Sequence, residues 1–137
     1  MKLFLYTDGG ARGNPGPAAI GAVLKNDKKE NVKEMGSYIG VGTNNEAEYA
    51  ALILGLKMAI EKGDTAGEGI ELECFLDSEL IVRQLNGIYK VKNPKMREFF
   101  KQVKLLEPKF SKIEYKHIKR ELNTEADAIV NQVLDAQ

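Results

Sequence analysis

Apolar positions divide the first 41 residues into three strand-like stretches. Residues 2–8 are almost continuously apolar, which is typical of a strand covered on both faces. Asp8-Gly9-Gly10 interrupts this stretch, and we expect a loop from there to about Pro17. Residues 19–24 and 32–41 indicate two further strands, joined by a turn at 26–28. The N-terminal part is therefore predicted to be a three-stranded meander.

The clearest helix start follows this meander. Thr43 and Glu46 have the spacing of a capping box, in which each side chain bonds the other residue's backbone N–H. Residues 50–60 are apolar on nearly all sides, so this helix is expected to pack on the sheet in the middle of the fold. Gly63 and Asp64 are expected to end it.

The second half alternates between strand and helix patterns. Residues 70–76 indicate a strand, Ser78 is a suitable cap for a helix to about Leu85, and residues 94–106 indicate a second helix with an early proline. Residues 113–118 alternate as a fifth strand, and Asn123 is expected to cap the last helix. The apolar stripe of that helix consists of Ala126, Ile129, Val130, Val133 and Leu134.

This order, β-β-β-α-β-α-α-β-α, predicts an α/β fold with a mixed five-stranded sheet flanked by helices. The length of 137 residues is that of one domain, and no linker or repeat divides residues 1–137.

Composition restricts the compartment. The single cysteine, Cys74, lies in an apolar stretch and fits a reducing cytoplasm. The N-terminal apolar stretch is too short for a signal peptide, and no apolar run approaches the ~20 residues that span a bilayer. We therefore expect a cytoplasmic monomer with no membrane partner.

Charge is unevenly distributed although the net charge is zero. Residues 83–120 contain twelve Lys or Arg and three acids, so the remainder is acidic. This pattern indicates either a phosphate-binding surface beside an acidic site or helix faces that lysines simply solvate.

Four acids stand where the local pattern predicts a buried or strand-end position. Asp8 ends an apolar strand, although Asp-Gly is also a common turn. Glu48 lies in an apolar helix and, unlike Glu46, has no capping role, although its charge also suits a helix N-terminus. Asp77 follows a strand, where α/β folds place ligands, and Asp127 borders an apolar stripe; both also suit helix starts.

Four motifs in order resemble those of the type 1 ribonuclease H family over essentially the whole chain. They are YTDGGARGNPGP (6–17), TNNEAEYAAL (43–52), LDS (76–78) with Val82, and NTEAD (123–127) with Asn131. The resemblance implies a metal-dependent endonuclease that hydrolyses the RNA strand of RNA–DNA hybrids, leaving 3′-hydroxyl and 5′-phosphate ends. It implies that Asp8, Glu48, Asp77 and Asp127 hold two Mg²⁺ or Mn²⁺ ions.

The resemblance also implies substrate-binding residues. Backbone groups and amide side chains would read the 2′-hydroxyl that distinguishes RNA from DNA, and a polar pocket would take a phosphate of the DNA strand. The residues at these positions are Gly9, Gly10, Ala11, Asn14, Thr43, Asn44, Asn45, Ser78 and Asn93.

One role in the family pattern has two candidate residues in this chain, and one segment of the pattern is replaced. His117 matches the family's catalytic histidine in its spacing from Asp127, yet the alternation around it favours a strand; Glu121 is the other candidate for that role. The basic helix and loop with which some members grip the hybrid is replaced by residues 87–92, so we expect weaker hybrid binding.

Three other interpretations compete with this one. A non-catalytic hybrid-binding module would lack at least one of the four acids, and an integrase or junction resolvase would lack the glycine-rich motif and the Thr-Asn-Asn segment. The chain is also compatible with one domain of a longer polypeptide.

Overall fold

A computed structural model describes residues 1–67 and 69–137. Within these ranges five strands form one mixed sheet in the order β3-β2-β1-β4-β5. The three N-terminal strands pair antiparallel, whereas β4 is parallel to both β1 and β5. The strands are β1 (Lys2–Ala11), β2 (Gly16–Lys25), β3 (Asn31–Gly42), β4 (Glu71–Leu76) and β5 (Lys112–His117).

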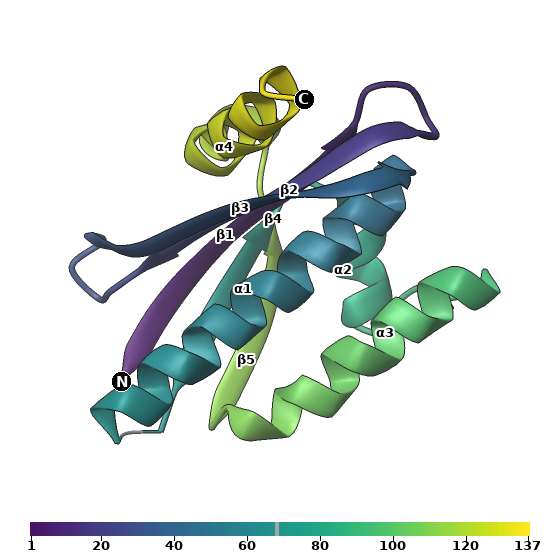
Figure 1. The fold of residues 1–137 in the computed structure, drawn as a ribbon. Helices are drawn as coiled ribbons and strands as arrows, with labels where there is room; N and C mark the ends of the chain where they lie inside the picture. Colours follow the sequence, from purple (N-terminus) through teal and green to yellow (C-terminus); the bar gives the residue numbers. More distant parts are fainter. Residues whose placement is uncertain (68) are drawn as a thin grey trace.

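Helices cover both faces of this sheet (Figure 1). Three of the described helices lie on one face: α1 (Asn44–Ala66), α2 (Glu79–Leu85) and α3 (Pro94–Leu106). The last helix, α4 (Thr124–Asp135), lies on the other face. Short 3₁₀ turns at Glu107–Lys109 and Arg120–Leu122 precede β5 and α4. The predicted fold class and element order are therefore confirmed.

The main core lies between α1 and the sheet. Tyr49, Leu52 and Leu56 of α1 are fully buried, as the apolar pattern of this helix predicts. They pack in one cluster with Leu5 of β1 and Leu72 of β4. This cluster holds α1 tightly against β1.

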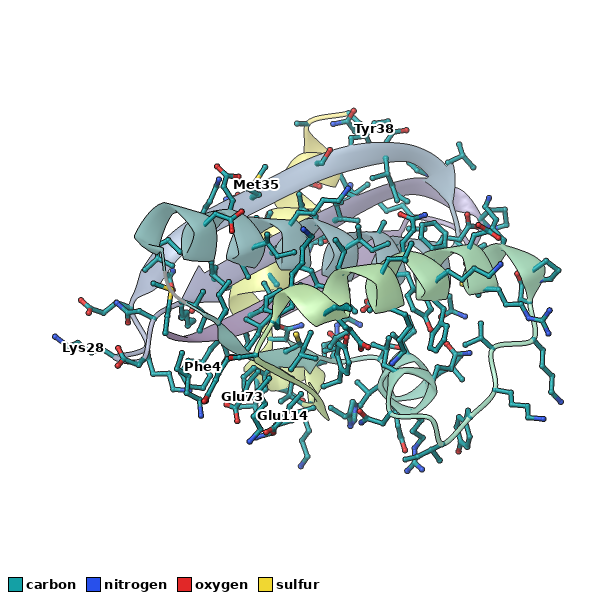
Figure 2. All side chains as sticks on the ribbon, turned by 90° about the horizontal axis from the view of Figure 1, so that it is seen from below. Phe4, Lys28, Met35, Tyr38, Glu73 and Glu114 are labelled. Atoms are coloured by element: carbon teal, nitrogen blue, oxygen red, sulfur yellow. The ribbon has the colours of Figure 1, made fainter. Side chains whose placement is uncertain are left out.

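The second face is thinner. Val130 and Leu134 of α4 pack on Ala19 of β2. Beyond α4, Phe4, Glu73 and Glu114 are cross-strand neighbours on β1, β4 and β5 and project from one side of the sheet (Figure 2). This part of the sheet is covered by side chains rather than by a helix.

Two predicted boundaries are wrong. The first strand does not break at Asp8 but runs to Ala11, because Asp8, Gly9 and Gly10 all pair with β2. The glycines permit close approach rather than a turn: a Cβ on Gly9 would lie 2.2 Å from the Ala47 carbonyl. The long helix does not end at Gly63 and Asp64 but continues to Ala66, where left-handed Gly67 (φ 68°) donates to the Gly63 carbonyl.

Candidate metal centre

Asp8, Glu48 and Asp77 meet at one edge of the sheet. Among the described residues, they offer carboxylate oxygens that all lie within 4.8 Å of one another. The topology explains the meeting of the two aspartates: β1 and β4 are parallel neighbours, and each aspartate stands two residues beyond the paired residues Tyr6 and Phe75. Helix α1, which packs against β1, contributes Glu48.

Glu48 is fixed by the backbone of β1. The Gly9 N–H donates to Glu48 Oε1 (3.2 Å). The other oxygen, Oε2, is buried and has no hydrogen-bond partner among the described residues. A buried acceptor without a donor is costly unless something else binds it. The free oxygen therefore fits a cation ligand.

Asp127 reaches the same cavity from α4. It lies outside the three-carboxylate group, accepts from Asn131 Nδ2 (3.3 Å) and has Arg120 Nη2 3.6 Å away. The cavity has a volume of about 500 Å³. Its lining residues are Asp8, Gly9, Gly10, Ala11, Arg12, Asn44, Asn45, Glu48, Asp77, Ser78, Arg120, Asp127, Val130, Asn131 and Leu134.

Burial and the negative charges of neighbouring carboxylates disfavour the ionised forms of Asp8, Glu48 and Asp77. Burial raises the pKa of Asp8 to about 7, and the charge of Asp77 adds to the rise. Burial and then the charge of Asp8 raise the pKa of Glu48 well above its ordinary value. Burial likewise raises the pKa of Asp77, against the opposing effects of the Asn123 side chain and Arg120. A divalent cation would remove this repulsion, and the all-oxygen donor set suits Mg²⁺ or Mn²⁺.

Asn123 connects the elements that carry these groups. Its side chain makes no capping hydrogen bond within the described residues, contrary to expectation, although the residue stands at the N-cap position of α4. Instead, its buried Nδ2 donates to the carbonyl of Thr7 (2.8 Å), the residue before Asp8. Its own carbonyl accepts the Asp127 N–H (3.1 Å). Tertiary contact thus replaces the local cap.

The amides expected to contact RNA form a chain beside the cavity. Asn14 Oδ1 accepts the Asn44 N–H (3.0 Å), and Asn44 Oδ1 accepts the Ala11 N–H (2.9 Å). The N–H groups of Gly9 and Ala11 therefore already have protein partners. Asn44 and Gly10 both line the cavity.

A second polar cavity of about 280 Å³ brings together Thr43 and Asn93, the two residues that the resemblance assigns to a phosphate pocket. Its lining residues are Asn14, Thr43, Asn45, Glu46, Asn93, Lys95 and Met96. Thr43 and Asn93 are the N-caps of α1 and α3, so two helix N-termini converge there. Such termini favour anions. Thr43 also forms the predicted capping box with Glu46, which is confirmed.

The candidates for proton handling lie elsewhere. His117 is the exposed last residue of β5, which confirms its strand position, and Glu121 is exposed in the 3₁₀ turn. Neither is among the described residues that line the cavity, whereas the neighbouring Arg120 is. Sequence reasoning missed Arg120, which it counted only as one charge of the basic segment. Ser78 lines the cavity and caps α2 as predicted.

Comparison with known proteins identifies the family. The model of the family described as "Reverse transcriptase-like" matches residues 6–133. The chain is 44% identical to LC11-RNase H1, whose structure in complex with RNA/DNA hybrid superposes with a TM-score of 0.92 and covers 98% of this chain and 97% of that one. The chain belongs to the type 1 ribonuclease H family. RNase H1 from Halobacterium salinarum, 37% identical, superposes over 100% of both chains with a TM-score of 0.93.

Some relatives of this ribonuclease H chain are longer. The bifunctional protein Rv2228c of Mycobacterium tuberculosis is 41% identical over 99% of this chain, which spans 36% of that protein. Ribonuclease HI of Halobacterium salinarum is 40% identical over 98% of the chain, which spans 65% of it. Within the described residues, no helix is both long and apolar enough to cross a membrane.

Proposed function

We propose that this chain is an endonuclease that hydrolyses the RNA strand of RNA–DNA hybrids, leaving 3′-hydroxyl and 5′-phosphate ends. The observation that carries the proposal is the group of three carboxylates within 4.8 Å, with Asp127 lining the same cavity. The hybrid as substrate is supported by similarity to LC11-RNase H1, which has been crystallised with one. Similarity and site chemistry therefore agree.

Asp8, Glu48, Asp77 and Asp127 would hold two Mg²⁺ or Mn²⁺ ions. Bound together, two such ions activate a water and stabilise the leaving oxygen of a phosphodiester. Glu48 Oε2 has no hydrogen-bond partner among the described residues, and negatively charged carboxylates surround Asp8. Both features favour the binding of a cation. Asp127 lies on α4, so whether its carboxylate reaches the same metal ions as the other three depends on the position of this helix.

Polar groups beside the metal centre would orient the hybrid. Gly10, Asn44 and Asn45 line the carboxylate cavity and would face the RNA strand and its 2′-hydroxyls. Asn45 also lines the second cavity, so the two cavities adjoin. Thr43 and Asn93 there would take a phosphate of the DNA strand at two helix N-termini. The Arg120 guanidinium would balance negative charge near Asp127.

Two broader features belong to the same proposal. The chain would act as a monomer, because all four carboxylates come from one chain. Its compartment would be the reducing cytoplasm, where the thiol of Cys74, buried in the core, stays free.

Labelled substrates test the proposal. Wild-type protein is incubated with Mg²⁺ or Mn²⁺ and RNA–DNA hybrid, double-stranded RNA or double-stranded DNA, and the ends are mapped. We expect cleavage of the RNA strand of the hybrid and none of double-stranded DNA, loss of at least about 100-fold in rate for Asp8→Asn, and full activity for Asp27→Asn in the exposed β2–β3 turn. Absence of cleavage by the wild type with either ion would refute the activity.

A further inference from the structure

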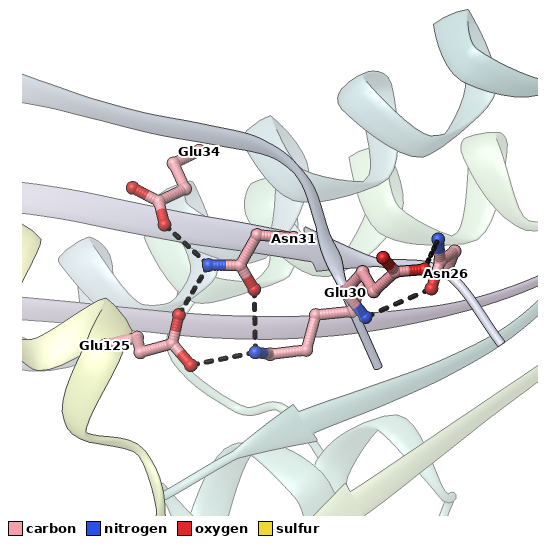
Figure 3. A network of polar contacts seen from close by, with 6 residues as sticks. Asn26, Glu30, Asn31, Glu34 and Glu125 are labelled. Carbon is pink, nitrogen blue, oxygen red and sulfur yellow. Dashed lines mark hydrogen bonds and ion pairs between the residues drawn. The ribbon is translucent and has the colours of Figure 1, made fainter. Parts of the chain in front are cut away.

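Glu125, two residues before Asp127, is held in a closed ring of polar side chains (Figure 3). Lys25 Nζ donates to Glu125 Oε1 (2.8 Å) and to Asn31 Oδ1 (2.7 Å). Asn31 Nδ2 donates to Glu125 Oε2 (2.7 Å) and closes the ring. We call Lys25, Asn31 and Glu125 the α4 clamp. Since Lys25 ends β2 and Asn31 begins β3, the clamp joins the first turn of α4 to the adjoining ends of these two strands.

The clamp differs from an ordinary surface ion pair. The Lys25 side chain is only 15% exposed, although that of Glu125 is 48% exposed, and both Glu125 oxygens are engaged. At the other end of α4, Arg12 and Asp135 also pair, but their side chains are 49% and 69% exposed. Exposed pairs contribute little because water screens them. The partly buried, three-membered clamp therefore fixes the N-terminal end of α4 more firmly.

The surface under α4 explains why polar anchors matter. The helix rests on glycines: a Cβ on Gly21 would lie 2.8 Å from the Ala126 carbonyl, and one on Gly36 would lie 2.5 Å from Ile129 Cγ2. The hydrophobic contribution of this contact is non-directional, and the glycines offer few side chains to hold the helix in one position along the strands. Directional polar bonds therefore help to set how far α4 lies along the sheet. Asn123 supplies one such bond, to Thr7, and the clamp supplies two more through Glu125 at the same end of the helix. The exposed Arg12–Asp135 pair lies at the far end.

We propose that Lys25 and Asn31 are positioning residues for Asp127. By holding Glu125 they fix the first turn of α4, and so the distance of the Asp127 carboxylate from the group formed by Asp8, Glu48 and Asp77. This inference rests on the proposed function, in which Asp127 is a metal ligand. Neither residue lines the carboxylate cavity within the described chain.

The substitution Lys25→Met separates positioning from charge. Loss of a cation near a metal centre raises metal affinity if only Coulomb interaction matters. Loss of positioning lowers it. We expect Mn²⁺ affinity, measured by titration calorimetry on the full chain, to fall about 10-fold, the lower end of what supporting residues contribute to metal sites. The kcat for hybrid should fall by a similar factor with KM unchanged.

Matched variants complete the experiment. Lys25→Arg should keep near wild-type Mn²⁺ affinity, and Lys28→Met, in the exposed turn, removes an equal charge without touching Glu125 and should change nothing. Asn31→Ala should lower the affinity without any change of charge, which keeps the test open if Lys25→Met fails to fold. Unchanged or tighter Mn²⁺ binding by Lys25→Met or by a folded Asn31→Ala overturns the inference.

A double-mutant comparison separates this inference from the proposed function. In an Asp127→Asn background, Lys25→Met should have no further effect on Mn²⁺ affinity, because the residue through which it acts is already disabled. An undiminished 10-fold loss in that background would contradict positioning through Asp127. A wild type that binds Mn²⁺ but cuts no hybrid would refute the proposed activity alone.

Discussion

Gly9 has two roles that a larger residue could not combine. Its N–H holds Glu48 Oε1, and its missing side chain lets α1 approach β1. Gly10, the next residue, is less confined: a Cβ there would meet Val130 Cγ1 at 3.7 Å, an ordinary contact distance. Adjacent glycines in one motif thus have different physical requirements.

We expect Gly9→Ala to destabilise the protein by about 3 kcal/mol or more, since a Cβ 2.2 Å from the Ala47 carbonyl forces backbone apart. Gly10→Ala is the matched control and should change the free energy of unfolding by less than about 1 kcal/mol. Urea denaturation of both variants measures the difference. Equal stability of the two would show that α1 shifts easily, against this packing.

The raised pKa of Asp8 makes stability depend on pH in the metal-free protein. Because burial holds this pKa at about 7, above its ordinary 3.8, the folded state binds the proton more tightly than the unfolded state between these values. This proton binding stabilises the folded state. The stabilisation is complete below about pH 4, declines as the pH rises and is lost above about pH 7.

With EDTA present, the wild type should gain on the order of 2 kcal/mol of unfolding free energy between pH 8 and pH 5. Asp8→Asn, which carries no charge at either pH, should show a smaller gain. Chemical denaturation at several pH values gives the comparison. A wild-type stability that rises with pH over this interval would contradict the burial of a charged carboxylate.

At the scale of elements, α4 depends on its connection to β1. The Asn123 side chain is buried and its Nδ2 bonds the Thr7 carbonyl. We expect Asn123→Ala to lower the free energy of unfolding by about 1–3 kcal/mol, because the carbonyl loses its donor inside the protein. Thr124→Ala, at the exposed next position, should have little effect. Thermal unfolding of both variants provides the measurement, and equal melting temperatures would contradict the role of Asn123.

Local sequence signals predicted the helices and strands well, whereas features that depend on tertiary contacts were missed. The capping box of Thr43 and Glu46 was predictable because both partners lie within one turn. The continuation of β1 through Gly9 was not, because it depends on pairing with β2 and on the approach of α1. The role of Asn123 depends on Thr7, 116 residues away. Arg120 carried no periodic signal at all.

At the scale of the molecule, several positively charged side chains lie together away from the carboxylates. A largely apolar groove of about 480 Å³ beside the α2–α3 connection is bordered by four cations, Lys90, Lys92, Arg97 and Lys101; its other lining residues are Gln84, Gly87, Tyr89, Val91 and Phe100. Lys90 and Lys92 belong to residues 87–92, the segment expected from the resemblance to replace the basic helix and loop of some family members, and Arg97 and Lys101 follow on α3. Lys92, which lines the groove, is followed in the chain by Asn93, which lines the polar cavity.

We expect hybrid binding to be weaker than that of a member with the longer segment, and to depend on the cations that remain. In an Asp8→Asn background, Lys90→Ala with Lys92→Ala should weaken hybrid binding and reduce the slope of log affinity against log salt by about one per lost phosphate contact. Lys62→Ala, exposed on α1, is the control. Binding isotherms over a salt series, compared with those of the longer enzyme, test both statements; equal affinity of the two enzymes would contradict the first.

The position of α4 on its own face of the sheet (Figure 1) makes completion of the site depend on the docking of a single helix. Helix α4 packs on β2 through its own small apolar cluster, separate from the main core that joins α1 to the sheet. Until α4 docks, three acids stand together with no fourth. Local opening of α4 alone would therefore remove the fourth carboxylate from the other three while the main core stays folded.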